Sequence, residues 1–515
     1  MWVSAALFAP QLVHGLLPDC APAATAVVLS NPTVLGNGTP ESVTTAAIQT
    51  ALNAGGEITF DVGSAPVTIV LTTELTVAKA AVLDGAGVVT LSGGGSHRVI
   101  RVTNPQNLTY TLRLQNIGIA NGATPAESGA GIFKASGGPW QAVSLIAVNC
   151  SFHDNVAIAT NQDGGGGAIY AIGMKDIIVQ SSSFERNRGS NGGALYSLGS
   201  KTVIVVDSLF SANHATGTNG NPGNGGNAGA IGIDGDERLV SLCGVELADN
   251  WANAFGAGFF SVMYDDLSAT NFNACTFLRN TNPTSSAFAG GAYLQGGPFS
   301  IQNSSFTKNE ANGVGALYIG PDAHGEIVNS TFEGNLARTS LAGAISIGTS
   351  GAVLLNQITV AGNLAPGPVA FAAGIAVDVS NAVTMKNSVL VDNVGGNAFN
   401  PWNIWHPVGD GGGNLQWPEH RPNGQSEPKA TATTVWADPD LEPMALYGGP
   451  TPTMPLSTGS PAVNAGVAAG APATDQRGRA RTALPDAGAV EGFADALFRD
   501  GFESGGTANW VQSPP

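Results

Sequence analysis

Two groups of acidic residues are the densest collections of chemically active side chains in this sequence. The first group is Asp234, Asp236 and Glu237, followed by Arg238, and the second is the pair Asp265 and Asp266. Clustered carboxylates can hold calcium or act as the acid and base that cleave a sugar bond, and a basic residue can abstract a proton. Both groups lie in expected turns, where carboxylates are usually solvated. They are catalytic candidates, with a solvated surface as the alternative interpretation.

A second arrangement that could transfer protons joins His153 and Asp154 to Glu185 and Arg186. The two pairs occupy the same place in consecutive copies of a repeat described below, so they are expected to lie about 5 Å apart. The sequence favours an exposed row of ion pairs over acid–base catalysis at this place.

Tryptophans gather near the C-terminal end of the chain. Trp402, Trp405, Trp417 and Trp436 are four of the eight tryptophans and lie within residues 400–436. An exposed indole offers an apolar face with a polar edge, which suits stacking on a sugar ring. Trp402, Trp405 and Trp417 are therefore binding candidates, and the alternative is that this segment packs as a lid over the last coil.

The elements that must position these residues follow from an internal repeat. Nine copies of a large apolar residue, two variable residues and an asparagine, such as FHDN and FERN, recur at intervals of 26 to 37 residues. A second motif, such as GGAIY or GGALY, alternates with the first. Apolar residues at a spacing of two precede each asparagine motif and indicate strands, and a one-residue change of phase indicates a bend. Short strands stacked at this period are typical of a solenoid.

The sequence therefore predicts an all-β, right-handed parallel β-helix, because parallel strands prefer right-handed crossovers. The asparagines of the nine copies should stack in one structural ladder at a tight corner, whose left-handed backbone asparagine tolerates. They are Asn155, Asn187, Asn213, Asn250, Asn280, Asn309, Asn335, Asn363 and Asn393. Residues 41–53 carry an apolar helical face and are expected to form a short helix that caps the open N-terminal end.

The four cysteines are too few to form a disulfide framework. Cys150 and Cys275 occupy an inward position of the repeat and are expected to be buried free thiols. Cys243 falls in a bend, where a free thiol is expected and a bond to Cys275 is the alternative. Acylation of Cys20 is disfavoured, because Leu-Pro-Asp precedes it instead of a small residue.

The distance between the two motifs varies on one side of the repeat only. From each asparagine to the next GGA glycine it ranges from 6 to 16 residues, whereas the rest of the repeat keeps a nearly constant length. All insertions should therefore emerge from one corner of the coil, which is expected to be the interaction side. The longest insertion, residues 214–229, lacks the aspartates of calcium-binding repeats.

Composition excludes several classes of protein. The 515 residues include 70 glycines, and 43% are hydrophobic whereas 11% are charged, which argues against a helical bundle and against disorder. The net charge of −17 argues against binding to nucleic acid or to an anionic membrane surface. No transmembrane helix is expected, because no apolar stretch is long enough. The chain is expected to be a monomer without a cofactor, and calcium enters only with the hypothesis of lyase activity.

Several segments resemble families of bacterial surface proteins. AVLDGAGVVTLSG is similar to the first strands of secreted pectate-lyase-like β-helix proteins, and the paired FxxN and GGA motifs resemble polymorphic outer membrane protein repeats. Residues 387–492, which include NSVLVDN, GGNLQW and DQRGRARTALPDAGAVEG, resemble the choice-of-anchor Q module, although that module usually has aspartate where this chain has Asn464. The tail LFRDGFESGG resembles a short terminal signature of exported bacterial proteins and is a candidate sorting signal.

These resemblances imply five parts of the chain. They are a signal-like segment (1–25), an N-terminal cap with the first coils (26–100), the β-helix repeats (101–397), choice-of-anchor-Q-like coils with a lid (398–494) and a tail (495–515). The implied function is an exported or cell-surface protein that is non-catalytic and adhesin-like, or that binds carbohydrate or a cell-surface glycan. The alternative is a polysaccharide lyase or glycoside hydrolase of pectate-lyase-like fold, although the Asn-Thr-Asp, Gly-His-Gly and Arg-Ile-Lys signatures of pectin-degrading hydrolases are absent.

Overall fold

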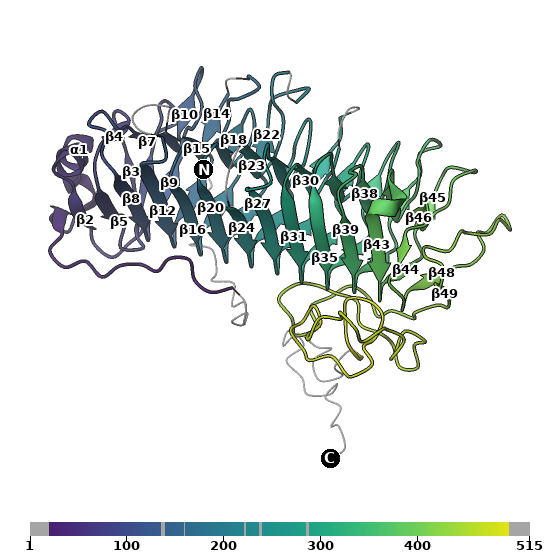
Figure 1. The fold of residues 1–515 in the computed structure, drawn as a ribbon. Helices are drawn as coiled ribbons and strands as arrows, with labels where there is room; N and C mark the ends of the chain where they lie inside the picture. Colours follow the sequence, from purple (N-terminus) through teal and green to yellow (C-terminus); the bar gives the residue numbers. More distant parts are fainter. Residues whose placement is uncertain are drawn as a thin grey trace, which may run out of the picture.

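The computed structural model describes residues 20–134, 140–158, 160–220, 223–235, 239–284 and 288–493. These residues form a right-handed parallel β-helix with three long sheets (Figure 1). Sheet A has fourteen strands from β1 (Thr33–Gly36) to β47 (Gly409–Asp410), and sheet B has fourteen from β3 (Val67–Val70) to β49 (Val435–Trp436). Sheet C has twelve strands from β4 (Leu75–Val77) to β46 (Ile404–Trp405). The predicted fold class is confirmed.

One coil illustrates how the repeat is built. β16 (Asp176–Gln180) lies in sheet A, β17 (Ser183–Glu185) in sheet B and β19 (Leu195–Leu198) in sheet C. Between sheets B and C, the two-residue strand β18 (Arg188–Gly189) belongs to a small additional sheet. β20 (Thr202–Val206) then begins the next coil beside β16. The insertions of variable length lie between the small sheet and sheet C, at the one corner that the spacing predicts.

Each coil turns two tight corners through a residue in the left-handed backbone region. At the corner between sheets A and B, five coils use asparagine, with φ between 47° and 52° at Asn116, Asn149, Asn303, Asn329 and Asn387. At the corner after sheet B, the left-handed residue is the one before the ladder asparagine, for example Asp154 with φ 56°. The tolerance of asparagine for this conformation therefore explains the first corner. The expectation of a left-handed backbone at the ladder asparagines is wrong, because the residue before each of them takes that conformation. The ladder asparagines serve the second corner through their side chains, as shown below.

The core consists of identical positions stacked along the axis. Phe152, Phe184 and Phe210 have no exposed surface, and their ring centroids are 4.5 and 4.4 Å apart in succession. Phe277 and Phe306 continue the same column after one leucine, with centroids 4.3 Å apart. Parallel strands in register repeat about every 4.8 Å, so a residue type that recurs at one phase packs on its own copies.

The N-terminal end is covered by α1 (Thr45–Ala54), which follows a short 3₁₀ turn, η1 (Pro40–Ser42). The helix begins four residues later than predicted, because the Thr44 hydroxyl accepts a hydrogen bond from the Ala47 N–H and caps it there. Gly55, with φ 77°, ends the helix. Ile48 and Leu52 are buried in the main core, so the helix closes the first coil.

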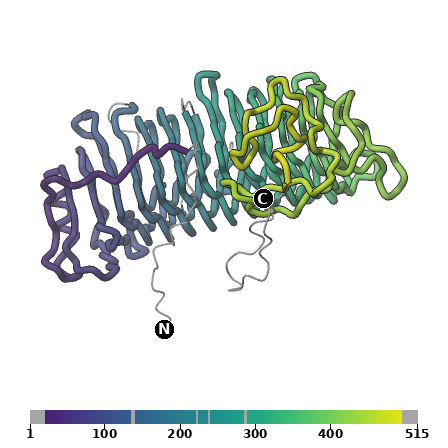
Figure 2. Tube along the Cα trace, turned by 90° about the horizontal axis from the view of Figure 1, so that it is seen from below, coloured from purple at the N-terminus to yellow at the C-terminus, as the bar shows by residue number. Residues whose placement is uncertain are grey.

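An N-terminal strap, residues 20–32, runs along the outside of sheet A in the direction opposite to the coils (Figure 2). The Ala23 N–H donates to Gln180 Oε1 at 2.9 Å, and the Val27 N–H donates to Gln115 Oε1 at 2.9 Å. The strap then reaches the first coils, where its chain continues into β1. Residues 20–25, which the sequence analysis groups with the signal-like segment, are thus part of the folded unit.

The C-terminal part of the chain does not continue the coils to its end. The last strands, β46, β47, β48 (Leu415–Trp417) and β49, complete the final coil, and residues 437–493 fold back along the outside of the solenoid (Figures 1 and 2). Asn356 Nδ2 donates to the Gly470 carbonyl at 3.0 Å, and Asn387 Nδ2 donates to the Val467 carbonyl at 3.0 Å. A second hydrophobic cluster packs Leu456 of this returning segment against strands of sheet B. The strap and the returning segment thus lie against different coils of the same solenoid.

Candidate functional site

The nine ladder asparagines form one continuous line of hydrogen bonds. Asn250 Oδ1 accepts from the N–H and from Nδ2 of Asn213, both at 3.0 Å, and Asn250 Nδ2 donates to Asn280 Oδ1 at 2.9 Å. All nine side chains are fully buried, and the line continues from Asn393 to Asn403 at 2.9 Å. Buried amides with these partners hold successive coils together. Their role is structural, and they do not face a ligand.

The charged pairs outside sheet B form a row of ion pairs. Arg186 donates to both carboxylate oxygens of Asp154 at 2.9 Å and lies 3.1 Å from Glu185, while His153 Nδ1 lies 2.8 Å from Asp154. Burial opposes the ionisation of Asp154, but the hydrogen bonds from Arg186 and His153 outweigh it and lower the pKa of this carboxyl. A carboxyl held ionised in this way is a poor acid, which favours the ion-pair interpretation.

Asp234 lies at the corner where sheet C turns into sheet A, at the end of β23 (Ile231–Asp234). The Tyr264 hydroxyl donates to Asp234 Oδ1 at 2.8 Å, and the Tyr196 hydroxyl donates to Asp234 Oδ2 at 3.3 Å. Burial and the nearby carboxylate raise the pKa of Tyr196 well above its usual value, so this hydroxyl stays protonated as a donor. The other members of this acidic group, Asp236 and Glu237, lie outside the described residues.

The second acidic pair belongs to the equivalent turn of the next coil. Asp265 Oδ1 accepts from the Leu267 N–H at 3.0 Å and from the Ser268 hydroxyl at 2.8 Å, so it stabilises its own turn. Asp266 is exposed. Among the residues that the structure describes, no three His, Cys, Asp or Glu side chains are grouped in a way that could hold a metal ion.

The tryptophans near the C-terminal end take part in packing. The Trp405 ring stacks on Phe371 with centroids 4.2 Å apart and on His406 with centroids 3.7 Å apart. Two rings at these distances cannot share one face of an indole, so both faces of Trp405 are covered. Trp417 packs against the second hydrophobic cluster. Trp402 is half-buried, and its backbone N–H donates to the buried carboxylate of Glu427 at 2.8 Å. These contacts favour the interpretation as packing at the last coil.

The outer face of sheet C carries an aromatic row that the sequence analysis does not identify. Six rings lie in register on adjacent or nearly adjacent strands, with Gly232 as the gap: Phe133, Tyr170, Tyr196, Phe260, Tyr293 and Tyr318. Ring centroids are 5.7 Å apart at the first pair and 5.0 Å apart at the last. The aromatic residues in GAGIF, GGAIY, GGALY and VGALY were the available signal. Because the rings stack on one another along the axis, their faces cover each other.

The corner that carries the insertions of variable length, between the small sheet and sheet C, borders this row. The Tyr170 hydroxyl donates to the Asp163 carbonyl at 2.9 Å, which ties one loop to sheet C. In the longest insertion, Gly220 and Gly225 exchange backbone hydrogen bonds of 2.8 and 3.1 Å, and the Ser190 hydroxyl of the preceding coil donates to the Asn224 carbonyl at 3.0 Å. The loops are therefore anchored on their neighbours and flank the outer face of sheet C.

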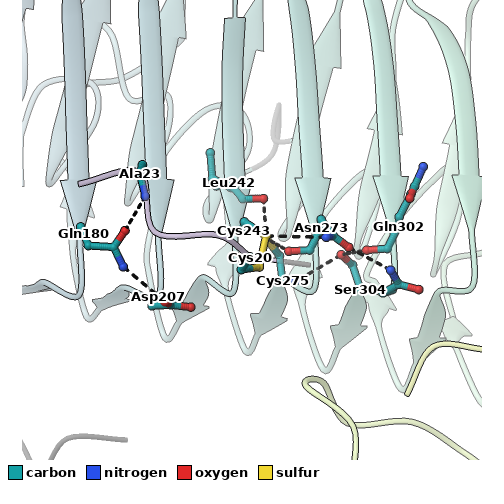
Figure 3. Close-up of a disulfide and its surroundings, with 11 residues drawn as sticks. Cys20, Ala23, Gln180, Asp207, Leu242, Cys243, Asn273, Cys275, Gln302 and Ser304 are labelled. Carbon is teal, nitrogen blue, oxygen red and sulfur yellow. Dashed lines mark hydrogen bonds between the residues drawn. A yellow bond between two sulfur atoms is a disulfide. The ribbon is translucent and has the colours of Figure 1, made fainter. Parts of the chain in front are cut away.

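The strap is fixed by a disulfide that the sequence analysis does not predict. Cys20 and Cys243 are bonded, with Cα atoms 5.5 Å apart across a sequence separation of 223 residues (Figure 3). The expectation of a free thiol in a bend at Cys243 and the alternative of a bond to Cys275 are both wrong, because Cys243 is the last residue of β24 (Leu239–Cys243) and the strap brings Cys20 onto it. Cys150 and Cys275 are buried free thiols as predicted, and burial raises the pKa of both to about 12.

Comparisons with known proteins give little beyond the architecture. No family model matches the chain, and no curated protein matches it. Among solved structures, the crystal structure of pectate lyase Pel9A is similar over 90% of this chain and 97% of that chain, with 14% sequence identity and a TM-score of 0.38. Within the described residues, no helix is long and apolar enough to cross a membrane. Function must therefore be argued from the side chains themselves.

Proposed function

We propose that this chain is an exported or cell-surface protein that serves as a non-catalytic, adhesin-like platform for carbohydrate or a cell-surface glycan. The observation that carries the proposal of export is the Cys20–Cys243 disulfide. Disulfides form and persist in oxidising compartments and are rare in the cytosol. A signal segment, under this proposal, ends before Cys20 and not at residue 25.

The proposed binding surface is the outer face of sheet C with the two corners that border it. Its framework has a constant length, whereas the loops on one side vary, which is typical of a rigid scaffold that carries recognition elements. Binding is supported over catalysis by the local engagement of Asp265, which stabilises its own turn. The similarity of residues 387–492 to the choice-of-anchor Q module, and of the repeats to polymorphic outer membrane protein repeats, supports a place at the bacterial cell surface. The tail after residue 494 is proposed to carry the sorting signal.

The experiment for export is peptide mapping of the protein recovered from outside the cytosol, without reduction. The expected result is a linked peptide pair containing Cys20 and Cys243, while Cys150 and Cys275 react with an alkylating reagent only after denaturation. A mature protein that begins after Cys20, or one in which Cys20 and Cys243 are both thiols, contradicts the proposal of export through this bond.

The experiment for function combines a glycan array with a polysaccharide depolymerisation screen. We expect glycan binding without depolymerisation, and we expect that replacing residues 214–229 by a six-residue turn alters binding while the fold is retained. Depolymerising activity that disappears when Asp236, Glu237, Asp265 and Asp266 are replaced by alanine would establish the lyase or hydrolase alternative, and its loss on removal of calcium with a chelator would add the ion to it.

A further inference from the structure

We propose that Trp140 and Tyr264, with Asp234 between them, form a binding site for an uncharged hexopyranose segment of a polysaccharide. The site lies at the corner where sheet C turns into sheet A, on the side of sheet C opposite the variable loops. This inference rests on the proposed function and gives it a ligand class and a location. It does not involve Trp402, Trp405 and Trp417, which are engaged in packing.

The indole of Trp140 lies with one face over Gly173 and with an edge against Gly199, two glycines of the following coils. A Cβ placed on Gly173 would lie 2.5, 2.6 and 2.7 Å from Trp140 Cε3, Cζ3 and Cδ2, and a Cβ on Gly199 would lie 2.6 Å from Trp140 Cζ2. The three distances from Gly173 are nearly equal, so a Cβ on this glycine would lie over the face of the ring and not at its edge. Both glycines adopt the left-handed backbone, with φ 59° and 60°, and their missing side chains leave room for the ring.

The opposite face of this indole is open to solvent. Trp140 is 58% exposed although one face rests on the protein. The Gln141 N–H donates to the Gly173 carbonyl at 2.7 Å, which fixes the backbone that carries the ring. In contrast to the stacked rings of sheet C and to Trp405, Trp140 offers a rigid apolar face. A flat aromatic surface held in this way meets the C–H face of a pyranose ring with little loss of side-chain entropy.

Two polar side chains, those of Asp234 and Tyr264, lie on the next two coils along the solenoid axis after Gly199. The Gly199 N–H donates to the backbone carbonyl of Asp234 at 3.2 Å, so the carboxylate lies one coil beyond the glycine that supports the indole. Tyr264, on the next coil, is 67% exposed and donates its hydroxyl to Asp234 Oδ1 at 2.8 Å. A phenolic oxygen that donates a hydrogen bond can also accept one, so a ligand hydroxyl can donate to the hydroxyl of Tyr264. From Gly173 to Tyr264 the coils rise about 14 Å, which is the scale of a short oligosaccharide.

The chemistry of the site selects an uncharged sugar. Sugar hydroxyls donate hydrogen bonds to a phenolic oxygen, whereas the carboxylates of a uronate polymer would be repelled by a protein of net charge −17. A small number of placed polar groups beside an aromatic surface is the usual composition of a ligand site.

The test is calorimetric titration of the whole chain with cellohexaose, laminarihexaose, mannohexaose and, as a charged comparison, hexagalacturonate. We expect binding of at least one uncharged hexasaccharide, a loss of about tenfold or more in affinity for Trp140→Ala, equivalent to about 1.4 kcal/mol, and a smaller loss for Trp140→Phe. Phe493→Ala is the control, because Phe493 is 42% exposed on the returning segment 437–493, away from sheet C and its corners, and should not affect binding. Circular dichroism melts establish that each variant is folded.

The other outcomes separate this inference from the proposed function. An uncharged hexasaccharide that binds equally to wild type and Trp140→Ala overturns the site but leaves carbohydrate binding in place. Binding of hexagalacturonate alone overturns the ligand class. No binding of any of the four sugars by the wild-type chain overturns the inference and counts against the carbohydrate part of the proposed function.

Discussion

Replacing Asn250 by alanine should be among the most destabilising single changes in the solenoid. The side chain is fully buried and joins its neighbours through four hydrogen bonds. The substitution removes the acceptor of the Asn213 N–H and the Nδ2 donor of the Phe210 carbonyl. By contrast, Asn213 Nδ2 still donates to the Phe184 carbonyl at 2.9 Å, and Asn280 Oδ1 still accepts from the backbone N–H of residue 250 at 3.2 Å. The Asn213 N–H is thus left unpaired at about 1–3 kcal/mol, and the Phe210 carbonyl loses one hydrogen bond but stays in the ladder between the paired strands, so the free energy of unfolding should fall by about 2–4 kcal/mol.

The assay is guanidinium unfolding followed by circular dichroism, without a reducing agent so that the disulfide is kept. Asp249→Asn is the control in the adjacent residue, because it removes a surface ion pair to Arg279 and preserves a residue type that tolerates φ 58°. Exposed pairs of this kind contribute about 0–1 kcal/mol. Asn250→Asp tests the donor separately, since a carboxylate would face the Phe210 carbonyl and Asn280 Oδ1. Equal midpoints for Asn250→Ala and Asp249→Asn would refute the assignment of the ladder as a major support of the fold.

Three further predictions concern the core, the thiols and the ion-pair row. Phe184→Ala should lower the free energy of unfolding by about 3–5 kcal/mol, because it removes a buried ring stacked on both sides, whereas Glu185→Ala should change it by about 0.5 kcal/mol or less; equal effects in denaturant melts would mean that the inward phase is assigned wrongly. Cys150 and Cys275 should resist iodoacetamide in the native protein at pH 8, because both are buried and the pKa of each thiol is raised to about 12; mass spectrometry that finds either thiol labelled before unfolding would contradict their burial. The pKa of Asp154 is lower in the folded protein than in the unfolded chain, so its stabilising contribution is fully present above the unfolded value of about 3.9 and is lost as the pH falls through the lower folded value. The urea midpoints of wild type and Asp154→Asn should therefore converge at low pH. A constant difference between them down to about pH 2.5 would refute this.

The candidate site shows where reasoning from the sequence was sufficient and where it was not. The ion-pair row of Asp154 and Arg186 was recoverable, because both residues have the same phase in consecutive repeats and therefore meet side by side. The aromatic row on sheet C is also encoded in the repeat, because its rings recur at one position of the GGA motif. Trp140 could not be found in this way, because it is not part of a recurring position. Its significance depends on which backbone atoms its ring lies against.

The sequence by itself determined the solenoid, its three long sheets, the inward phenylalanines and the asparagine ladder. In a parallel stack each residue meets the copy of itself one period away, so a one-dimensional repeat already specifies the tertiary neighbours. The tertiary structure alone decided the course of the segments that do not repeat. The bond from Cys20 to Cys243, the return of residues 437–493 along the outer surface and the placement of Trp140 on Gly173 and Gly199 join parts of the chain with no common period. Such contacts depend on the path of the whole chain in space, which spacing along the sequence does not encode.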